Sequence, residues 1–343
     1  MDSLFAMLPG ALLPWYASNC RQLPWRKDKD PYHVWVSEIM LQQTRVEAVK
    51  EYYKRFLQAL PTVDALAHCE DERLMKLWEG LGYYSRVRNM KKAAVMIVDA
   101  YDGLFPKEHE KVLALPGIGV YTAGAICSIC YDAPTPAVDG NVLRVIARIT
   151  DDKTPIDSEG YKKQVQARLA EVYPSQAGAF TQALMELGAT HCGPNKKAEC
   201  DACPCNHFCL ARLHGTADML PVKTPKKQRR EEDRTVFIFC CDGQYALTKR
   251  PFKGLLAGLW QFPDVMGKLE PQQALAEAEA MGLQPEQLHR QSDRIHIFTH
   301  VQWNMRGYYI DVKQKQGDFT WFTPQQLNSE AALPTAYRQF WME

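Results

Sequence analysis

The chain has 343 residues, of which 46% are hydrophobic and 24% are charged, and its formal net charge is +1. These fractions are ordinary for a soluble protein, and a chain of this length can form two domains with sizeable cores. The balanced charge does not by itself indicate a nucleic-acid binder. No apolar run reaches the roughly 20 residues that span a membrane, and the N-terminus, with an early acid and two prolines, is unlike a signal peptide. We therefore expect a cytoplasmic protein with no membrane partner; separately, we expect a monomer.

The first chemical candidate is Glu38, in a helix that we expect at about residues 33 to 50 with the sequence YHVWVSEIMLQQTRV. Apolar neighbours disfavour an ionised carboxylate, so the pKa of Glu38 should rise and let it act as an acid near neutral pH. The alternative is a surface glutamate paired with Arg45. Gln42 and Gln43, near the end of the same helix, are placed to offer amides to a base.

A glycine-rich turn follows in LPGIGVYTAGAIC, residues 115 to 127. Gly117 and Gly119 allow a tight turn and a close approach to a ligand, and an apolar helix candidate comes directly after them. Such a turn presents backbone N–H groups to a phosphate, which is the form of a helix-hairpin-helix DNA-binding element. The alternative is an ordinary helical hairpin.

Asp139 lies in AVDGNVLRVIARIT, residues 137 to 150, where another helix is expected to begin. Aspartate is a favoured N-cap, so a purely structural role explains it. A capping Asp is also held ionised and in a fixed place, which suits an anionic catalyst facing a cation.

Four cysteines, Cys192, Cys200, Cys203 and Cys209, have the spacing C-x7-C-x2-C-x5-C, with Cys205 as a fifth thiol inside the array. In a reducing compartment, clustered thiols bind metal more often than they form disulfides. Zinc sites commonly use two C-x2-C pairs, whereas this array has one, so the order of spacings favours a [4Fe-4S] cluster over zinc, disulfides or free thiols.

The sequence pattern changes after the cysteines, from one typical of helices to one that includes strands. Residues 1–213 are expected to be helical, residues 214–232 are a polar linker, and residues 233–343 form a second, α+β domain. The stretch TVFIFCCDGQYALTKR predicts two strands joined by an Asp-Gly turn, IHIFTHVQWNMRGYYIDV predicts further strands, and PQQALAEAEAMG predicts a helix.

These motifs together resemble the adenine DNA glycosylases of the MutY type, within the endonuclease III and helix-hairpin-helix superfamily. The resemblance runs in the family's order over nearly the whole chain. It is carried by LPWR (23–26), SEIMLQQTRV (37–46), GLGYYSRVRN (80–89), LPGIGVYTAGAI (115–126), VDGNVLRV (138–145), the cysteine array and FTH (298–300).

The resemblance implies an enzyme that flips adenine, mispaired with 8-oxoguanine or guanine in double-stranded DNA, into a pocket and hydrolyses its glycosidic bond. Glu38 matches the acid that protonates adenine, and Asp139 matches the carboxylate that stabilises or traps the sugar cation. Asn141 and Tyr121 match residues that order the site around Asp139. The superfamily's strand-cleaving members carry a lysine at the position of Tyr121, so the resemblance implies a monofunctional glycosylase.

For DNA contacts, Gln43 and Tyr83 match side chains that wedge into the base stack, and Arg26 matches a motif position near the adenine pocket. The C-terminal domain resembles a Nudix fold, with GLLAGLWQFP at 254–263, but lacks the glutamate cluster that holds magnesium, so it is expected to bind rather than to hydrolyse. Its FTH triplet implies that Phe298, Thr299 and His300 recognise 8-oxoguanine.

Two departures from the family pattern remain. The first cysteine spacing is seven residues instead of the usual six, in a loop whose Lys196 and Lys197 could contact phosphates, and Thr299 replaces the commoner serine while keeping the hydroxyl. Two other functions stay open: a related mismatch or oxidised-pyrimidine glycosylase, and a non-catalytic DNA-binding relative.

Overall fold

The structure is a computed structural model that describes residues 2–194, 198–225 and 228–341. Lys196 and Lys197 lie outside these ranges. The chain divides into two compact units, Met1–His68 with Arg88–Pro225 and Cys69–Val87 with Lys226–Glu343. No helix in the described part of the chain has the length and apolar character that crossing a membrane requires.

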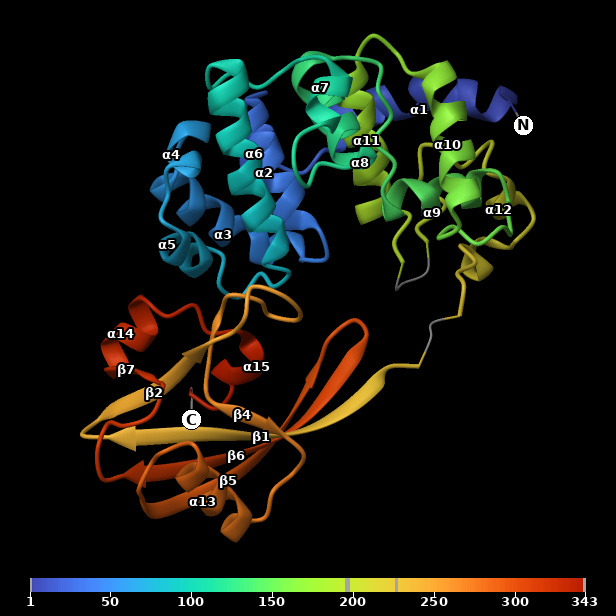
Figure 1. The fold of residues 1–343 in the computed structure, drawn as a ribbon. Helices are drawn as coiled ribbons and strands as arrows, with labels where there is room; N and C mark the ends of the chain where they lie inside the picture. The colour runs from blue at the N-terminus through green and yellow to red at the C-terminus, as the bar shows by residue number, and fades with distance from the viewer. Residues whose placement is uncertain (1, 195–197, 226–227, 342–343) are drawn as a thin grey trace. The chain divides into compact units, whose positions relative to one another are not determined.

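The first unit is helical (Figure 1). Its elements are α1 (Asp2–Asn19), the short 3-10 helix η1 (Pro24–Arg26), α2 (Pro31–Leu41), α3 (Val46–Ala59), α4 (Val63–Ala67), most of α6 (Ser85–Tyr101), α7 (His109–Leu113), α8 (Val120–Tyr131), α9 (Gly140–Ile149), α10 (Glu159–Val172), α11 (Ala177–Thr190), α12 (Leu210–Leu213) and η2 (Ala217–Met219).

Helix α8 is the centre of this unit. Every residue from Thr122 to Ile129 is buried, as expected for a helix that is apolar on all sides. It packs against α2 and α11, while α11 also packs against α9 and the N-terminal helix α1. This packing brings together the three helices that carry the candidate catalytic residues.

The turn between α7 and α8 is the expected helical hairpin. Gly117 has φ +76, and a Cβ built on it would lie 2.6 Å from Asn89 Cβ, so both conformation and space require glycine. Gly119 has φ −97, which any residue adopts, and it is the N-cap of α8. No atom lies within 4 Å of a Cβ built there, so its missing side chain leaves open space beside the first N–H groups of α8.

The single helix expected at residues 33 to 50 is wrong. Helix α2 ends at Leu41, Gln42 is an extended C-cap with ψ 107, and α3 begins at Val46. Gln43 between them has a left-handed φ of +63. Glutamine is a good helix former, so local propensity gives no sign of this break, and the packing of α2 against α3 overrides it.

The second unit contains the sheet. Its elements are α5 (Asp71–Leu77), the first turn of α6, β1 (Arg230–Cys241), β2 (Gln244–Lys249), β3 (Trp260–Gln261), β4 (Asp264–Met266), α13 (Pro271–Ala280), β5 (Pro285–Ile297), β6 (Val301–Val312), β7 (Thr320–Phe322), α14 (Pro324–Ser329) and α15 (Thr335–Arg338). In the described residues the strand order is β3-β2-β1-β6-β5, with β4 paired to β1 and β7 to β2.

The central strand β1 has both faces buried. Val236 and Ile238 point to the core shared with α14 and α15, whereas Phe237 and Phe239 point to the core shared with α13. The apolar run in β1 is therefore continuous, as in a strand covered on two sides.

The predicted α+β organisation of the C-terminal part is confirmed. Strands β1 and β2 are antiparallel and joined by Asp242 and Gly243, with φ of +47 and +70, which is the geometry of the expected Asp-Gly turn. The helix expected in PQQALAEAEAMG is α13, and β5 and β6 form the later hairpin. β1 begins at Arg230, within the stretch taken as linker.

Candidate active site

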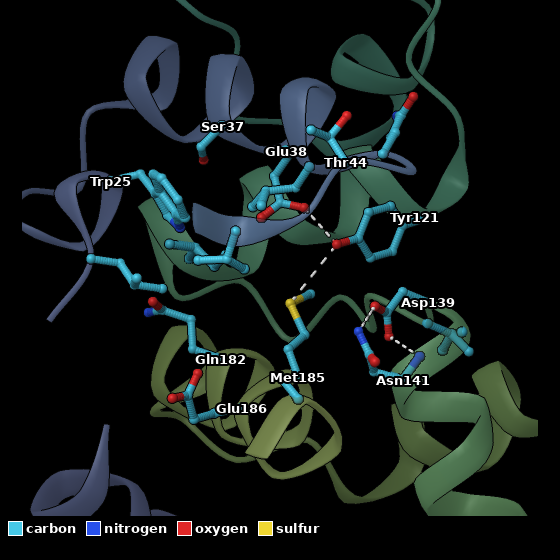
Figure 2. A pocket seen from close by; sticks show the side chains of 18 of the residues that line it. Trp25, Ser37, Glu38, Thr44, Tyr121, Asp139, Asn141, Gln182, Met185 and Glu186 are labelled. Carbon is cyan, nitrogen blue, oxygen red and sulfur yellow. Dashed lines mark hydrogen bonds between the residues drawn. The ribbon is translucent and has the colours of Figure 1, made fainter. Parts of the chain in front are cut away.

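The first unit contains a pocket of about 690 Å³ (Figure 2). Helices α2, α8, α9 and α11 and the segment around η1 supply its walls. The lining residues that carry the argument are Trp25, Arg26, Glu38, Gln42, Gln43, Tyr121, Asp139, Asn141, Gln182, Met185 and Glu186.

Glu38 is 6% exposed, so the surface-glutamate alternative is wrong. Burial raises the pKa of Glu38 to about 7, the hydroxyl of Tyr121 opposes that rise, and the charge of Asp139 adds to it. Tyr121 Oη donates to Glu38 Oε2 at 2.5 Å. No group in the described residues donates to Oε1, which is therefore the oxygen that can carry a proton to a ligand.

Asp139 is the N-cap of α9, as expected. Its Oδ1 accepts the backbone N–H groups of Asn141 at 2.9 Å and Val142 at 2.8 Å, and its Oδ2 accepts the Asn141 side-chain amide at 2.7 Å. Burial raises the pKa of Asp139, while these three N–H donors favour the charged form. Of Glu38 and Asp139, Asp139 is the one that accepts several N–H donors, which stabilise its anion.

The orientation of the Asn141 side chain is fixed by Arg144. Arg144 Nη2 donates to Asn141 Oδ1 at 2.8 Å, so the amide nitrogen must face Asp139. Arg144 Nη2 also donates to Gly188 O at 2.7 Å. A Cβ at Gly188 would lie 2.6 Å from Asn141 Cβ, so α9 and α11 can only approach this closely with glycine there.

The pocket also contains a third carboxyl group, Glu186, which the sequence did not single out. Glu186 accepts from Arg21 Nε at 2.6 Å and from Arg26 Nη2 at 2.8 Å. Burial alone would raise the pKa of Glu186, but the two arginines outweigh it and hold the pKa below its usual range. Arg26 thus reaches the pocket as the partner of Glu186. Glu186 lies in the apolar stretch FTQALMELGA, just as Glu38 lies among apolar residues. The same pattern, a glutamate with apolar neighbours, could have identified Glu186 from the sequence.

Other predicted DNA-contact residues lie in several places. Gln42 and Gln43 line the pocket, whereas Gly117 and Gly119 form the α7–α8 hairpin.

The second unit carries Tyr83 and the turn between β5 and β6. Thr299 and His300 are exposed in that turn. Phe298 is half-buried, with its ring 4.8 Å from that of Trp303, which is 1% exposed and belongs to the core. Tyr83 Oη lies 2.7 Å from Thr299 Oγ1.

The four predicted cysteine ligands, Cys192, Cys200, Cys203 and Cys209, surround one small cavity. Arg148 Nη1 lies 3.1 Å from Cys192 Sγ. The fifth thiol, Cys205, lines the same cavity, but it is 1% exposed and belongs to the helical core. Among the described residues no three Cys, His, Asp or Glu side chains converge as ligands of a single ion.

The chain is similar in sequence and fold to known proteins. The family described as "HhH-GPD superfamily base excision DNA repair protein" matches residues 36–174, and a NUDIX domain matches residues 234–343. A solved thermostable thymine-DNA glycosylase has the same fold, with 24% identity and a TM-score of 0.55 over 62% of this chain and 98% of that one. A trapped endonuclease III–DNA covalent intermediate matches with 21% identity and a TM-score of 0.54, over 63% and 98%. The class is thus that of helix-hairpin-helix base-excision repair proteins.

Curated relatives identify the family within this class. "Adenine DNA glycosylase" from Arabidopsis thaliana is 36% identical over 88% of this chain, which spans 56% of that protein. The enzymes of that name from Rattus norvegicus and Homo sapiens are each 33% identical over 96% of this chain, which spans 76% and 72% of them. The chain therefore belongs to the adenine DNA glycosylase family of base-excision repair enzymes, which hydrolyse an N-glycosidic bond.

We predict that Glu38→Gln lowers the single-turnover rate of base excision by about 10²- to 10⁴-fold, because the amide cannot deliver a proton. Duplex binding should persist. In the unsubstituted protein, the acid is active when protonated, so the rate should be level below pH 7 and fall as pH rises past the pKa of about 7. A near-normal rate for the variant, or a rate that rises across that range, would contradict this role.

Asp139→Asn separates chemistry from capping. Asparagine is also a good N-cap, so the melting temperature should change little, while the loss of the negative charge should abolish detectable excision. Thermal unfolding and single-turnover kinetics measure the two effects separately. If activity survived, Asp139 would have only its structural role.

Proposed function

We propose that this chain flips adenine mispaired with 8-oxoguanine or guanine out of duplex DNA and removes it by hydrolysis, without cleaving the strand, and that it works as a monomer. The observation that carries this proposal is the pair of unlike carboxyl groups in one pocket. Glu38 is poised to hold a proton near neutral pH, whereas Asp139 is surrounded by N–H donors.

In the proposed reaction, Glu38 transfers its proton to a ring nitrogen of adenine as the bond to the sugar breaks, so the base leaves as a neutral molecule. The positive charge left on the sugar is stabilised by Asp139. Water then adds its oxygen to the anomeric carbon, and its proton returns to Glu38. Tyr121 holds Glu38 Oε2, and Asn141 holds Asp139 Oδ2, so neither carboxyl group needs to reorganise during the reaction.

Tyr121 supports the monofunctional part of the proposal. Strand cleavage in the superfamily uses an amine that attacks the sugar and forms a Schiff base. Here the matching position carries a phenol, and burial raises its pKa well above the usual value, so it stays protonated. Its hydroxyl is committed to Glu38.

A substrate panel tests the proposal against the other two functions. Adenine opposite 8-oxoguanine and opposite guanine should be excised, while thymine opposite guanine and thymine glycol should not. Strand breaks should appear only after alkali treatment of the product. Excision of a pyrimidine in preference to adenine would favour the related glycosylase, and binding without excision of any base would favour the non-catalytic relative.

We further propose that Cys192, Cys200, Cys203 and Cys209 hold a [4Fe-4S] cluster. Such a cluster takes one thiolate per iron, so its ligands stand around a body larger than one ion. Zinc instead needs four sulfurs at about 2.3 Å from a single centre. The four cysteines line one cavity, and their array has only one C-x2-C pair where zinc sites commonly have two, so we favour the cluster. When bound, it would join Cys192 to the segment that carries Cys200, Cys203 and Cys209.

The cluster proposal predicts a brown protein with four irons per chain. Cys200→Ala should lower the iron content and DNA binding, whereas Cys205→Ala should keep both, because Cys205 packs in the core and is the matched control. Metal analysis of anaerobically purified protein checks this. One zinc per chain and no iron would contradict it.

The β5–β6 turn is our candidate for reading the base opposite adenine. Thr299 and His300 are exposed there beside Tyr83, and their hydroxyl, imidazole and phenol offer polar groups to the extra oxygen and N–H of 8-oxoguanine. A well-made polar contact to a base edge is worth about 1–3 kcal/mol of discrimination.

Thr299→Val keeps the shape of the side chain and removes its hydroxyl, and Thr299→Ser keeps the hydroxyl. We predict that the valine variant lowers the preference for 8-oxoguanine over guanine by about 5- to 150-fold, while the serine variant retains it. The ratio of single-turnover rates on the two duplexes measures this. Equal losses in both variants would assign Thr299 a packing role.

A further inference from the structure

The segment Cys69–Val87 belongs to the second unit although it precedes most of the helical one in sequence. It consists of α5 and the glycine-rich turn that carries Tyr83. Two acids attach it to the C-terminal residues. Glu72 pairs with Lys249 and accepts from Trp260 Nε1 at 3.2 Å, and Glu79 forms the second attachment.

Glu79 is the better buried of the two, with its side chain 8% exposed. It accepts the backbone N–H of Leu333 at 3.0 Å and pairs with Arg338 at 2.7 Å and with Lys76 at 2.8 Å. Lys76 in turn donates to the carbonyl of Ala331 at 2.9 Å. A buried carboxylate with three donors is costly to remove, because its partners are left unsatisfied.

Directly after Glu79 the backbone takes an unusual path. Gly80, Gly82 and Tyr83 have φ of +97, +68 and +46. Glycine adopts these values freely, but a tyrosine in this region costs of order 1–3 kcal/mol and persists only where its surroundings determine the conformation.

Trp78 is one of the residues that determine this conformation, and it is fully buried and next to Glu79 in sequence. Trp78 Nε1 donates to Gly82 O at 3.0 Å, and the Arg86 guanidinium lies 5.3 Å from the Trp78 ring and 5.5 Å from the Tyr83 ring. Tyr83 remains 47% exposed, with its hydroxyl on Thr299. The turn is therefore fixed at one end by Glu79 and at the other by Thr299.

We propose that Glu79 is a positioning residue for base recognition: by fixing the turn to the C-terminal domain, it holds Tyr83 beside Thr299 so that both meet the strand opposite adenine as one preformed surface. The inference rests on the proposed function. In this proposal the C-terminal domain has two roles. It contributes the β5–β6 turn with Thr299, and it fixes the conformation of the turn that carries Tyr83.

Glu79 would make the same contacts if it only stabilised the fold. The test must therefore show that its effect on base recognition depends on Tyr83. The quantity to measure is the ratio of single-turnover excision rates for adenine opposite 8-oxoguanine and opposite guanine. Stacking of an aromatic side chain on a base is worth about 1–3 kcal/mol, so Tyr83→Ala should lower this ratio by about 5- to 150-fold.

Glu79→Gln should lower the ratio by a smaller factor, on the order of threefold or more. In the Glu79→Gln, Tyr83→Ala double variant the ratio should match that of Tyr83→Ala alone to within about twofold, because the first change has nothing left to act through. If the ratio in the double variant fell by the product of the two single-variant factors, the two residues would act independently and the proposal would be overturned. Arg338→Ala tests the same attachment from the other side if Glu79→Gln folds poorly, and exposed Glu70→Gln in the same segment is the matched control.

Amide hydrogen exchange in the DNA-free protein gives a readout independent of catalysis. Exchange at Leu81 and Arg86, whose N–H groups donate to Trp78 O and Tyr83 O within the turn, should speed up in Glu79→Gln and stay unchanged in Glu70→Gln. If the unsubstituted protein excised no adenine, the proposed function would fail. If it excised and discriminated normally while Glu79→Gln changed neither the ratio nor the exchange, only the present inference would fail.

Discussion

The helical unit has to place two carboxyl groups in one pocket. An isolated charge away from water is costly, and two like charges in one site raise each other's pKa. The chain treats the two groups differently. Glu38 meets apolar surroundings and a phenol, while Asp139 meets the open end of a helix, where N–H groups have no partners within the helix. The asymmetry of acid and anion thus follows from the burial of Glu38 within α2 and from the place of Asp139 at the start of α9.

This arrangement depends on close helix packing. α8 lies between α2 and α11 and carries Tyr121, which reaches Glu38 from one side. α11 approaches α9 closely at Gly188, because a Cβ there would lie 2.6 Å from Asn141 Cβ. Asn141 is the residue whose side-chain amide donates to Asp139. Glu186, two residues before Gly188 on α11, is neutralised by two arginines from the segment around η1. The pocket is therefore assembled from segments that are distant in sequence.

The sequence was informative where a residue type matched a local rule. Asp139 was recognisable as a helix cap, Gly117 as a turn residue and Asp242 with Gly243 as a hairpin turn, because each of these roles is decided within a few neighbours. The separation into a helical part and an α+β part followed from the change of hydrophobic pattern.

Long-range features could not be predicted in this way. The break after Leu41, the salt bridges of Glu186 and the grouping of residues 69–87 with the C-terminal sheet are decided by contacts between distant segments. Arg26 was expected near the base, and the structure gives it a carboxylate partner that no local pattern announces. The family resemblance supplied roles for such residues, but the physical basis of those roles required the three-dimensional contacts.

Two of the residues matched to the family's wedge side chains, Gln43 and Tyr83, have left-handed backbones, with φ of +63 and +46. For residues with a Cβ this conformation costs roughly 1–2 kcal/mol, and glycine would adopt it without that cost. Glycine at either site would relieve the backbone and at the same time remove the side chain that the site displays. At these two positions the chain therefore sets thermal stability against the display of a side chain, and a search for more heat-resistant variants of this protein would select against the residues matched to the DNA wedge.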